Sequence, residues 1–227
     1  MTPLHRHQLA CLSPVGWRHV CERDWDATAR DCLGHWAEHR LPLVIARQTI
    51  GDDADDTIAM GLAAPRRWGR RRISLRVPRN DILYFDEFPR ADEMPAPSPA
   101  AARVAWNSLC AQLSACGVTA RVYGSHGWRH VSGLDHVRNG SDIDLWIAVS
   151  DPQQADTVAA VLASFASGPL RLDGELVFAG DAAVAWCEWR RWRAGDAKAL
   201  LVKTISGASL ERTLTWCRAE HALESAA

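Results

Sequence analysis

The stretch SDIDLWIAV, residues 141–149, determines how the second half of this chain is interpreted. Side chains alternate along a strand, so Asp142 and Asp144 would share one face while Ile143 and Leu145 enter the core. The two carboxylates, roughly 7 Å apart at their Cα atoms, would repel each other unless a cation lay between them. Mg²⁺ prefers oxygen ligands and shares its coordination sphere with substrate phosphates. The pattern predicts a Mg²⁺ or Mn²⁺ site held by Asp142 and Asp144; the plainer alternative is two solvated aspartates at a sheet edge.

The segment before this strand carries a second phosphate-binding signal. Residues 119–124, TARVYG, predict a short strand that runs into Gly124 and Ser125 and then into a helix. A glycine lets the backbone approach a phosphate, and the serine hydroxyl and helix N-terminal amides can bind its oxygens. Gly-Ser turns alone are common and mostly structural. The order strand, Gly-Ser, helix, loop and DID strand is much rarer, and it predicts a nucleotide-handling site.

This order resembles the active-site motif of the nucleotidyltransferase superfamily, typified by DNA polymerase beta and the aminoglycoside nucleotidyltransferases. One departure is the stretch from Ser125 to Asp142, which is longer than usual in that superfamily. Its extra part, GLDHVRNG at residues 133–140, predicts a loop over the site. The resemblance implies a two-metal transfer, in which paired ions stabilise the attacking and leaving oxygens of a phosphoryl displacement.

The superfamily takes a third carboxylate from a neighbouring strand. Here LRLDGELVF, residues 170–178, offers Asp173 and Glu175, which lie two apart and so share a face. Either could complete the metal site or deprotonate the attacking hydroxyl; the alternative is an Asp-Gly hairpin turn with a surface glutamate. Lys203, on the later strand ALLVKT, could neutralise a phosphate or could be a plain surface lysine.

Composition and spacing divide the chain into two expected domains. The proline-containing stretch ADEMPAPSPAAA, residues 91–102, predicts a linker. Residues 1–94 would form an N-terminal α/β domain for substrate or carrier-protein recognition, and residues 95–227 a nucleotidyltransferase-like catalytic domain. The expected class is α+β (mixed α/β), with a mixed sheet flanked by helices. The patterns predict strands at 41–48, 71–77, 119–124, 142–150, 170–178, 183–192 and 199–204, and helices near Trp25 and Trp36, at 101–116, from 151 to 165 and from 209 to 223.

Charge, hydropathy and cysteine usage exclude several classes of protein. The formal net charge of −1 over 227 residues gives no general attraction to nucleic acid or to an anionic membrane. No apolar run is long enough to span a bilayer, and the N-terminus lacks a signal-peptide core. The seven cysteines form no CxxC pair, so free thiols in the cytoplasm are expected.

A closer resemblance covers most of the chain. GSHGWRHVSGLDHV (124–137), SDIDLW (141–146), LDGEL (172–176), AVAWCEW (183–189) and LLVKT (200–204) resemble the phosphoribosyl-dephospho-CoA transferases of bacterial malonate decarboxylase systems, also called holo-[acyl-carrier protein] synthases. In the first half, LPLVIARQ (41–48) and MGLAAPRRWGRRRISLRV (60–77) are similar to that family's N-terminal domain.

The resemblance implies a donor, an acceptor and a reaction. A triphosphoribosyl-dephospho-CoA donor would be joined to a serine of the decarboxylase's acyl-carrier subunit, and pyrophosphate would leave. Carried over by position, Asp142 and Asp144 would be the metal pair, and Gly124 and Ser125 the phosphate turn. The donor's dephospho-CoA tail and the carrier acceptor rest on the resemblance alone.

Other polar and aromatic residues carry weaker signals. His126 and His130, like His35 and His39, are spaced i, i+4, but metal binding needs a third ligand, which neither pair offers from the sequence. Trp128, with His130, is a candidate for packing against the donor's base or ribose. The arginine run could be a solvated face or could dock an acidic carrier; it comprises Arg66, Arg67, Arg70, Arg71, Arg72 and Arg76.

Two competing functions stay open at this point. One is a transferase that moves a nucleoside monophosphate from ATP onto a small molecule or a regulatory protein. The other is a non-catalytic toxin–antitoxin module that retains the fold. Retention of both aspartates, the Gly-Ser turn and an acidic third strand speaks against the second, because a degenerate member would be free to lose them.

Overall fold

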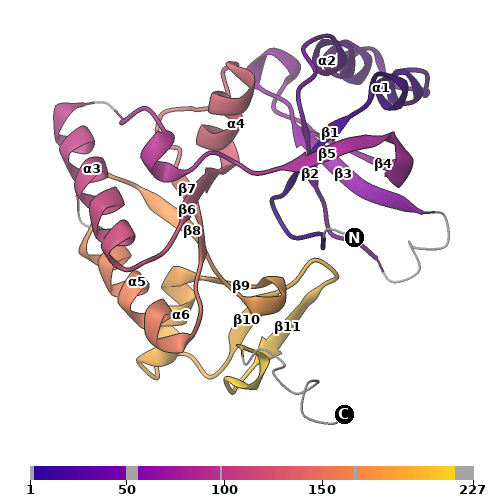
Figure 1. The fold of residues 1–227 in the computed structure, drawn as a ribbon. Helices are drawn as coiled ribbons and strands as arrows, with labels where there is room; N and C mark the ends of the chain where they lie inside the picture. Colours follow the sequence, from indigo (N-terminus) through magenta and orange to yellow (C-terminus); the bar gives the residue numbers. More distant parts are fainter. Residues whose placement is uncertain (1–2, 50–55, 98, 166–167, 218–227) are drawn as a thin grey trace, which may run out of the picture. The chain divides into compact units, whose positions relative to one another are not determined.

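The chain folds into two compact units, neither of which is one continuous segment (Figure 1). The computed structural model describes residues 3–49, 56–97, 99–165 and 168–217. Unit 1 comprises Met1–Pro89, Tyr123–Ser141 and Ile205–Gly207, and unit 2 comprises Arg90–Val122, Asp142–Thr204 and Ala208–Ala227. Each unit has its own sheet and its own hydrophobic core. The expected α+β class is confirmed.

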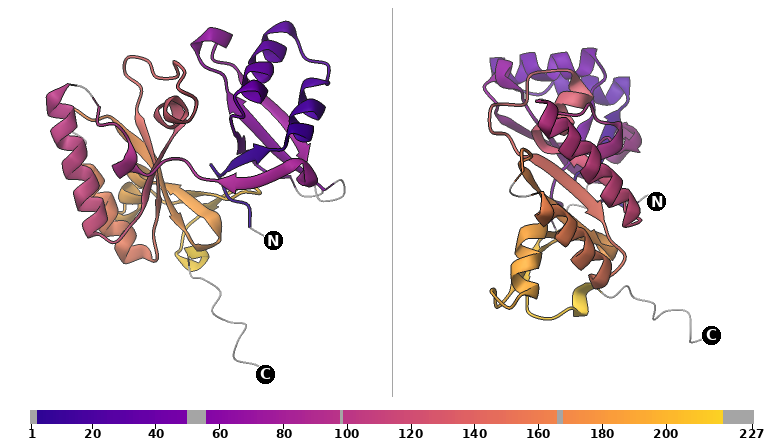
Figure 2. Two further views of the ribbon diagram at one scale, coloured as in Figure 1. Left: turned by 45° about the horizontal axis from the view of Figure 1, so that its top comes forward. Right: turned by 90° about the vertical axis from the view of Figure 1, so that its left-hand side faces the viewer.

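Unit 1 is built on a five-stranded antiparallel sheet in the order β4-β3-β2-β1-β5. Its strands are β1 (Leu9–Leu12), β2 (Leu43–Ile45), β3 (Thr57–Ala63), β4 (Arg72–Pro78) and β5 (Ile82–Asp86). In β4, Ile73, Leu75 and Val77 are buried on alternate positions, as the sequence pattern predicts. Helices α1 (Pro14–Cys21) and α2 (Ala27–Glu38) lie together against this sheet, as both views in Figure 2 show.

Each of these two helices begins at a side-chain cap. Ser13 Oγ accepts a hydrogen bond from the backbone N–H of Gly16, and Asp26 Oδ1 accepts one from that of Ala29, both at 2.9 Å. A third helix, α4 (Gly124–Ser132), also belongs to unit 1 and buries Trp128 in its core. The core is therefore completed by a helix that the chain supplies long after the sheet.

Unit 2 contains the mixed sheet that the sequence predicts. Its order is β11-β10-β9-β8-β7-β6, with β7 and β8 parallel and β8 to β11 antiparallel. The strands are β6 (Ala120–Tyr123), β7 (Ile143–Ala148), β8 (Leu172–Phe178), β9 (Ala182–Ala185), β10 (Leu200–Lys203) and β11 (Ala208–Glu211). Helices α3 (Ala100–Ala115), α5 (Pro152–Ser164) and α6 (Trp186–Arg193) lie along one side of it (Figure 1).

The core of unit 2 lies between the sheet and these helices. Ile143, Leu145 and Ile147 of β7 are at most 6% exposed and pack against apolar side chains of α3 and α5. Asp151 caps α5, as its place before Pro152 predicts, by accepting hydrogen bonds from the N–H groups of Gln153 and Gln154. Residues at the intervening positions of β7 therefore face away from the helices.

Two element assignments from the sequence are wrong. Residues 183–192 were expected as one strand, but the strand ends at Ala185 and α6 begins at Trp186. Trp186 and Trp189 are both buried, and their i, i+3 spacing fits a helix face. Residues 209–223 were expected as an amphipathic helix, but β11 occupies Ala208–Glu211 and pairs with β10. Residues 218–223 of that expected helix lie outside the described residues.

The expected linker is partly ordered structure. A 3-10 helix spans Ala91–Glu93, Ala91 is 4% exposed, and α3 already begins at Ala100. Within the described part of the chain, no helix is both long and apolar enough to cross a membrane. All seven cysteines are free thiols, which agrees with their spacing in the sequence.

Candidate active site

Four carboxylates lie on one face of the parallel pair β7 and β8. Asp144 is the Cα partner of Asp173, and Trp146 is the partner of Glu175. Paired residues of adjacent strands point to the same side of a sheet, and Asp142 lies two residues before Asp144. The cluster of Asp142, Asp144, Asp173 and Glu175 therefore lies on the face opposite the helix-packed core, as the sequence predicts for each pair.

Asp144 is the carboxylate most affected by this arrangement. Burial, and after it the neighbouring charges of Asp173, Asp142 and Glu175, together raise the pKa of Asp144 from 3.8 to about 6. Both causes oppose ionisation, because the charged form is poorly solvated and meets like charges. A cation would remove both penalties. A raised pKa from a like-charge cluster is a common feature of functional sites.

Two basic side chains already neutralise two of the carboxylates. Arg171 Nε donates to Asp142 Oδ1 at 2.7 Å, with both side chains substantially exposed. Lys203 Nζ donates to Glu175 Oε1 at 2.9 Å, and the Glu175 side chain is only 5% exposed. No local pattern predicts the contact between Arg171 and Asp142, since the two residues are 29 positions apart in the chain. Lys203 is not a plain surface lysine; its role toward a phosphate stays a prediction.

These contacts separate the two candidates for the third carboxylate. Glu175 is buried and paired with Lys203, whereas Asp173 is exposed and stands directly beside Asp144. Asp173 Oδ1 also accepts a hydrogen bond from the Gly174 N–H at 2.8 Å. We therefore favour Asp173 as the third member of the site and Glu175 as a structural partner of Lys203.

Gly174 allows the two strands to approach closely at this point. Its φ of +134° lies in a region that L side chains rarely adopt, and a Cβ there would collide with the backbone oxygen of Leu145. Leu145 is the Cα partner of Gly174 across the β7–β8 ladder. The Asp-Gly sequence is thus part of a continuous strand rather than the hairpin turn considered from the sequence.

The donor set suits a hard divalent cation. Asp142, Asp144 and Asp173 offer only carboxylate oxygens, which Mg²⁺ and Mn²⁺ prefer over sulfur and imidazole. The carboxylate oxygens of these three aspartates do not all lie within 4.8 Å of one another. An ion here would take its other ligands from water or phosphate, as Mg²⁺ usually does.

The Gly-Ser turn and the loop that follows it lie in unit 1. Gly124 and Ser125 begin α4 immediately after β6, as predicted. Residues 133–140 form the predicted loop without regular secondary structure, and His136 within it is buried. Arg70 Nη1 donates to the His136 carbonyl at 2.8 Å. Whether this loop covers a bound donor stays a prediction.

Trp128 is a core residue of unit 1. It is 4% exposed, and its ring packs edge-to-face on Phe88 at 5.4 Å and lies 6.4 Å from Trp36. A ring enclosed in this way has no free face for a base or ribose, so the expected donor contact of Trp128 is not retained. The position of Trp128 on α4, just after the Gly-Ser turn, directs its side chain into the core of unit 1.

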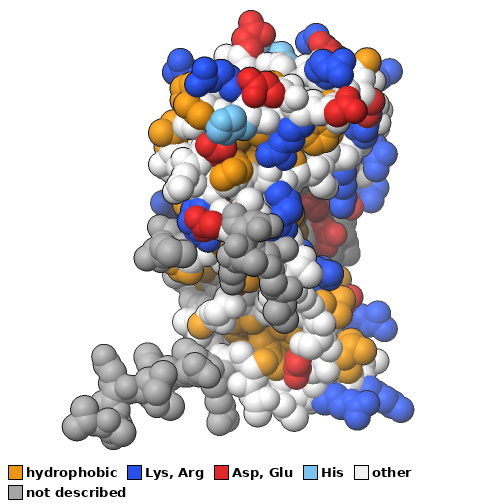
Figure 3. Space-filling view, turned by 90° about the vertical axis from the view of Figure 1, so that its right-hand side faces the viewer, with side chains coloured by type: hydrophobic (Ala, Val, Ile, Leu, Met, Phe, Trp, Pro, Cys, Tyr) orange, Lys and Arg blue, Asp and Glu red, His pale blue; other side chains and the backbone are white. Residues whose placement is uncertain are grey.

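The arginine run is largely used within unit 1. Arg71 pairs with Asp26 at 2.7 Å, Arg67 lies 4.6 Å over the Trp68 ring, and Arg76 bonds Thr57. On the described part of the face in Figure 3, basic side chains are scattered among acidic ones. Docking of an acidic carrier by this run stays a prediction.

Comparisons with known proteins cover nearly the whole chain. Residues 5–88 match the model of the phosphoribosyl-dephospho-CoA transferase MdcG N-terminal domain, and residues 90–213 match that of the MdcG C-terminal domain. The chain belongs to the phosphoribosyl-dephospho-CoA transferase family. The four carboxylates on β7 and β8 fall within the C-terminal match, and the relatives' name makes the chain a transferase.

Several phosphoribosyl-dephospho-CoA transferases align over most of their length. The chain is 35% identical to one from Bradyrhizobium diazoefficiens over 204 residues, 89% of this chain and 88% of that protein. It is 31% identical to one from Xanthomonas euvesicatoria over 81% of this chain and 85% of that protein, and 29% identical to one from Pseudomonas putida over 77% and 82%. No solved structure matches the chain.

Proposed function

We propose that this transferase moves the phosphoribosyl-dephospho-CoA group from triphosphoribosyl-dephospho-CoA onto a serine of the acyl-carrier subunit of malonate decarboxylase. Pyrophosphate would be the leaving group. The family supports the donor class, because the matched relatives are named phosphoribosyl-dephospho-CoA transferases. The observation that carries the proposed chemistry is the cluster of Asp142, Asp144 and Asp173 on one face of β7 and β8.

The proposed reaction is a phosphoryl displacement with pyrophosphate as the leaving group. The serine oxygen of the carrier forms a bond to the α-phosphorus, and the bond from that phosphorus to the bridging oxygen of the pyrophosphate breaks. Asp142, Asp144 and Asp173 would hold Mg²⁺ or Mn²⁺, which supplies positive charge to the triphosphate. Asp173, whose side chain is exposed, would also accept the serine proton, which a carboxylate can do in the transition state.

The first turn of α4 is the proposed phosphate contact. Tyr123 occupies the N-cap position and makes no capping hydrogen bond with its side chain, so the turn's amides are not satisfied by that residue. Gly124 has a φ of +61°, a backbone conformation that suits glycine. Helix N-terminal amides carry partial positive charge and bind phosphate oxygens. We propose that Gly124 and Ser125 bind one phosphate of the donor.

Intact-mass spectrometry of the acyl-carrier subunit tests the proposal. The carrier is incubated with the protein, Mg²⁺ and either triphosphoribosyl-dephospho-CoA or ATP. We expect a mass increase equal to the phosphoribosyl-dephospho-CoA group from the first donor, none from ATP, and none with Asp144→Asn. Replacement of the target serine by alanine in the carrier is the acceptor control. An AMP-sized increase from ATP, with no change from the CoA-derived donor, would identify a nucleotidyltransferase of different substrate class.

A further inference from the structure

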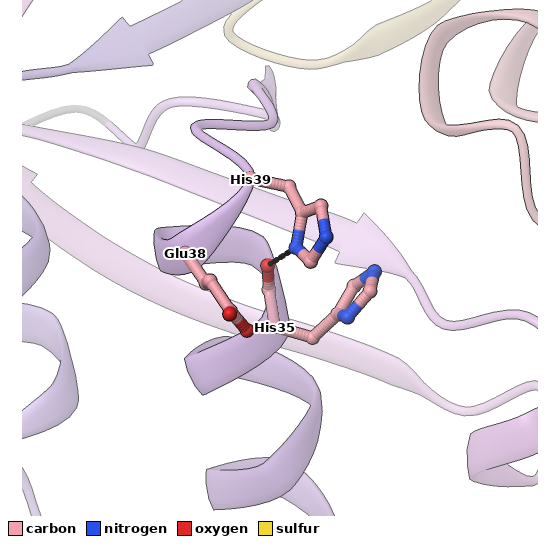
Figure 4. Close-up of side chains that lie close together, drawn as sticks. All are labelled: His35, Glu38 and His39. Carbon is pink, nitrogen blue, oxygen red and sulfur yellow. Dashed lines mark hydrogen bonds between the residues drawn. The ribbon is translucent and has the colours of Figure 1, made fainter.

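A second group of metal-binding side chains lies on α2, far in sequence from the carboxylate cluster. His35, Glu38 and His39 each place a ligand atom within 4.8 Å of the others at the end of the helix (Figure 4). The spacing i, i+3, i+4 brings the three onto one helix face. The spacing of His35 and His39 in the sequence indicates no third ligand, whereas the structure brings a carboxylate oxygen of Glu38 within 4.8 Å of a ring nitrogen of each histidine.

One histidine of this group is already oriented as metal-bound histidines usually are. His39 Nδ1 lies 2.9 Å from the backbone carbonyl of His35, and a carbonyl can only accept, so Nδ1 carries the proton (Figure 4). The lone pair of His39 is therefore on Nε2, the nitrogen free to bind an ion. Ligating histidines commonly donate their other N–H to a backbone carbonyl in this way, which fixes the tautomer and the ring orientation.

The ring of the second histidine, His35, lies directly against that of His39. The His35 and His39 rings stack at 4.0 Å, a geometry in which two positive rings would repel each other. A neutral imidazole is the form that binds metal ions.

We propose that His35, Glu38 and His39 bind a divalent transition metal ion of the zinc type. Two imidazoles and one carboxylate are a donor set of zinc sites that keep an open coordination position. The group lies at the C-terminal end of α2, where the helix dipole favours a cation. Tetrahedral ligands on zinc lie about 3.4 Å apart, so small side-chain rotations close the group around an ion.

The surroundings leave room for the remaining ligands. His35 and Glu38 line an open pocket of about 460 Å³ together with Arg30, Asp31 and Arg67. The positive charges of Arg30 and Arg67 disfavour a bound cation. The negative charges of Asp31 and Glu38 offset this effect. Arg67 is held over Trp68, 4.6 Å from its ring centroid, and its charge lies 4.0 Å from Asp31. Water would complete the coordination on the pocket side.

A Co²⁺ titration of the full-length protein tests this site. Co²⁺ replaces zinc in such sites and gives visible absorption bands, and thiolate ligands would reveal themselves by a charge-transfer band in the near ultraviolet. The titration is made in excess Mg²⁺ to occupy the carboxylate cluster and is followed by displacement with Zn²⁺. We expect one equivalent, without the thiolate band, in the wild-type protein. His39→Ala should weaken binding at least about 100-fold and Glu38→Gln about 10-fold.

Two variants serve as matched controls. His130→Ala removes one member of the other i, i+4 histidine pair, and Asp144→Asn removes a member of the carboxylate cluster; both should bind Co²⁺ like the wild type. His39 is exposed, so its replacement leaves the core of unit 1 intact, which circular dichroism verifies. Wild-type binding by His39→Ala, loss of binding in either control, or a thiolate band would each overturn the proposal.

Discussion

Asp144 has one neighbouring carboxylate along its own strand and another across the ladder to β8. Its pKa of about 6 in the folded protein compares with an ordinary value of 3.8. Between these two pH values the folded chain binds more protons at this position than the unfolded chain does. Stability therefore falls as pH rises through this window, and the loss is complete above the folded pKa.

Asp144→Asn should accordingly stabilise the metal-free protein at neutral pH. The shift of roughly two pKa units corresponds to about 3 kcal/mol at most, since one unit is about 1.4 kcal/mol. In urea unfolding with EDTA, we expect the variant and the wild type to be similar at pH 4 and the variant to be more stable at pH 7. Added Mg²⁺ should stabilise the wild type alone. Equal stabilities at both pH values would show that Asp144 is not repelled by its neighbours.

Asp173 and Glu175 should respond differently to neutral amide replacements. We expect Asp173→Asn to lower the transfer rate by about 10²–10³-fold without loss of stability, because it removes a negative charge beside Asp144. Glu175→Gln should lower the rate by less than about tenfold and cost about 2 kcal/mol of stability through its contact with Lys203. Single-turnover kinetics and urea unfolding measure the two effects. The reverse pattern would make Glu175 the third carboxylate.

His136 should make unit 1 sensitive to mild acid. Burial first, and then Arg70, lower the pKa of this buried imidazole to about 4 from 6.5. The unfolded chain thus binds more protons between these values, so stability falls as pH drops from about 6.5 to about 4. The shift amounts to about 3 kcal/mol. We expect His136→Gln, compared with the wild type by urea unfolding, to lose less stability between pH 7 and pH 4.5; parallel losses would contradict this.

At the scale of elements, alternation and helix caps predicted most of unit 2. The DID strand has buried Ile143, Leu145 and Ile147 within one run, and Asp151–Pro152 marks the start of α5, so local pattern alone identifies both. The α6 segment was assigned to a strand because its alternation of small and large residues fits one. The structure buries both Trp186 and Trp189, which a helix achieves at this spacing. The β11 segment carries helical spacing in Leu210 and Leu214, yet the edge of β10 offers backbone partners that favour a strand.

Contacts between distant segments were beyond any local pattern. Arg171 and Asp142 are 29 residues apart, and Lys203 and Glu175 are 28 apart, so neither pair follows from spacing. The sequence does predict the pair Asp142 and Asp144 and the turn at Gly124 and Ser125, because the residues within each motif are close in sequence. The preference for Asp173 over Glu175 required the register of β7 on β8 and the place of Lys203 on β10.

Gly174→Ala tests the β7–β8 ladder itself. The substitution places a Cβ against the Leu145 oxygen at a positive φ, so the strands must separate where Asp144 and Asp173 face each other. We expect a loss of at least about 3 kcal/mol, the upper range for backbone strain, together with loss of transfer. Gly180→Ala is a suitable control, because its Cβ would meet no atom within 4 Å although its φ is also positive. Equal stability of the two variants would contradict the close approach.

At the scale of the whole molecule, the boundary between the matched family domains does not coincide with the boundary between the two compact units. Unit 1 takes Tyr123–Ser141 from the second half of the sequence, including Trp128. A fragment that ends at residue 94 therefore leaves Trp36 and Phe88 without this neighbour in the core.

The fragment of residues 1–94 should fail to fold alone. Loss of a buried tryptophan typically costs about 3–5 kcal/mol, comparable with the whole stability of a small domain. We expect weak, non-cooperative unfolding by circular dichroism and chemical-shift dispersion typical of an unfolded chain, in contrast to the full-length protein. A fragment with cooperative unfolding and native-like dispersion would show that α4 is dispensable for the N-terminal core.

The same path of the chain sets the order of events on the ribosome. The nascent sheet of unit 1 emerges first, but the helix that carries Trp128 is translated only after α3 and β6 have been made. At about 5–20 residues per second, the partly complete core stays uncovered for several seconds. During that interval the apolar faces of α2 and the sheet are open to chaperones and to aggregation. Expression yield should therefore depend on translation speed and temperature more than the size of the protein suggests.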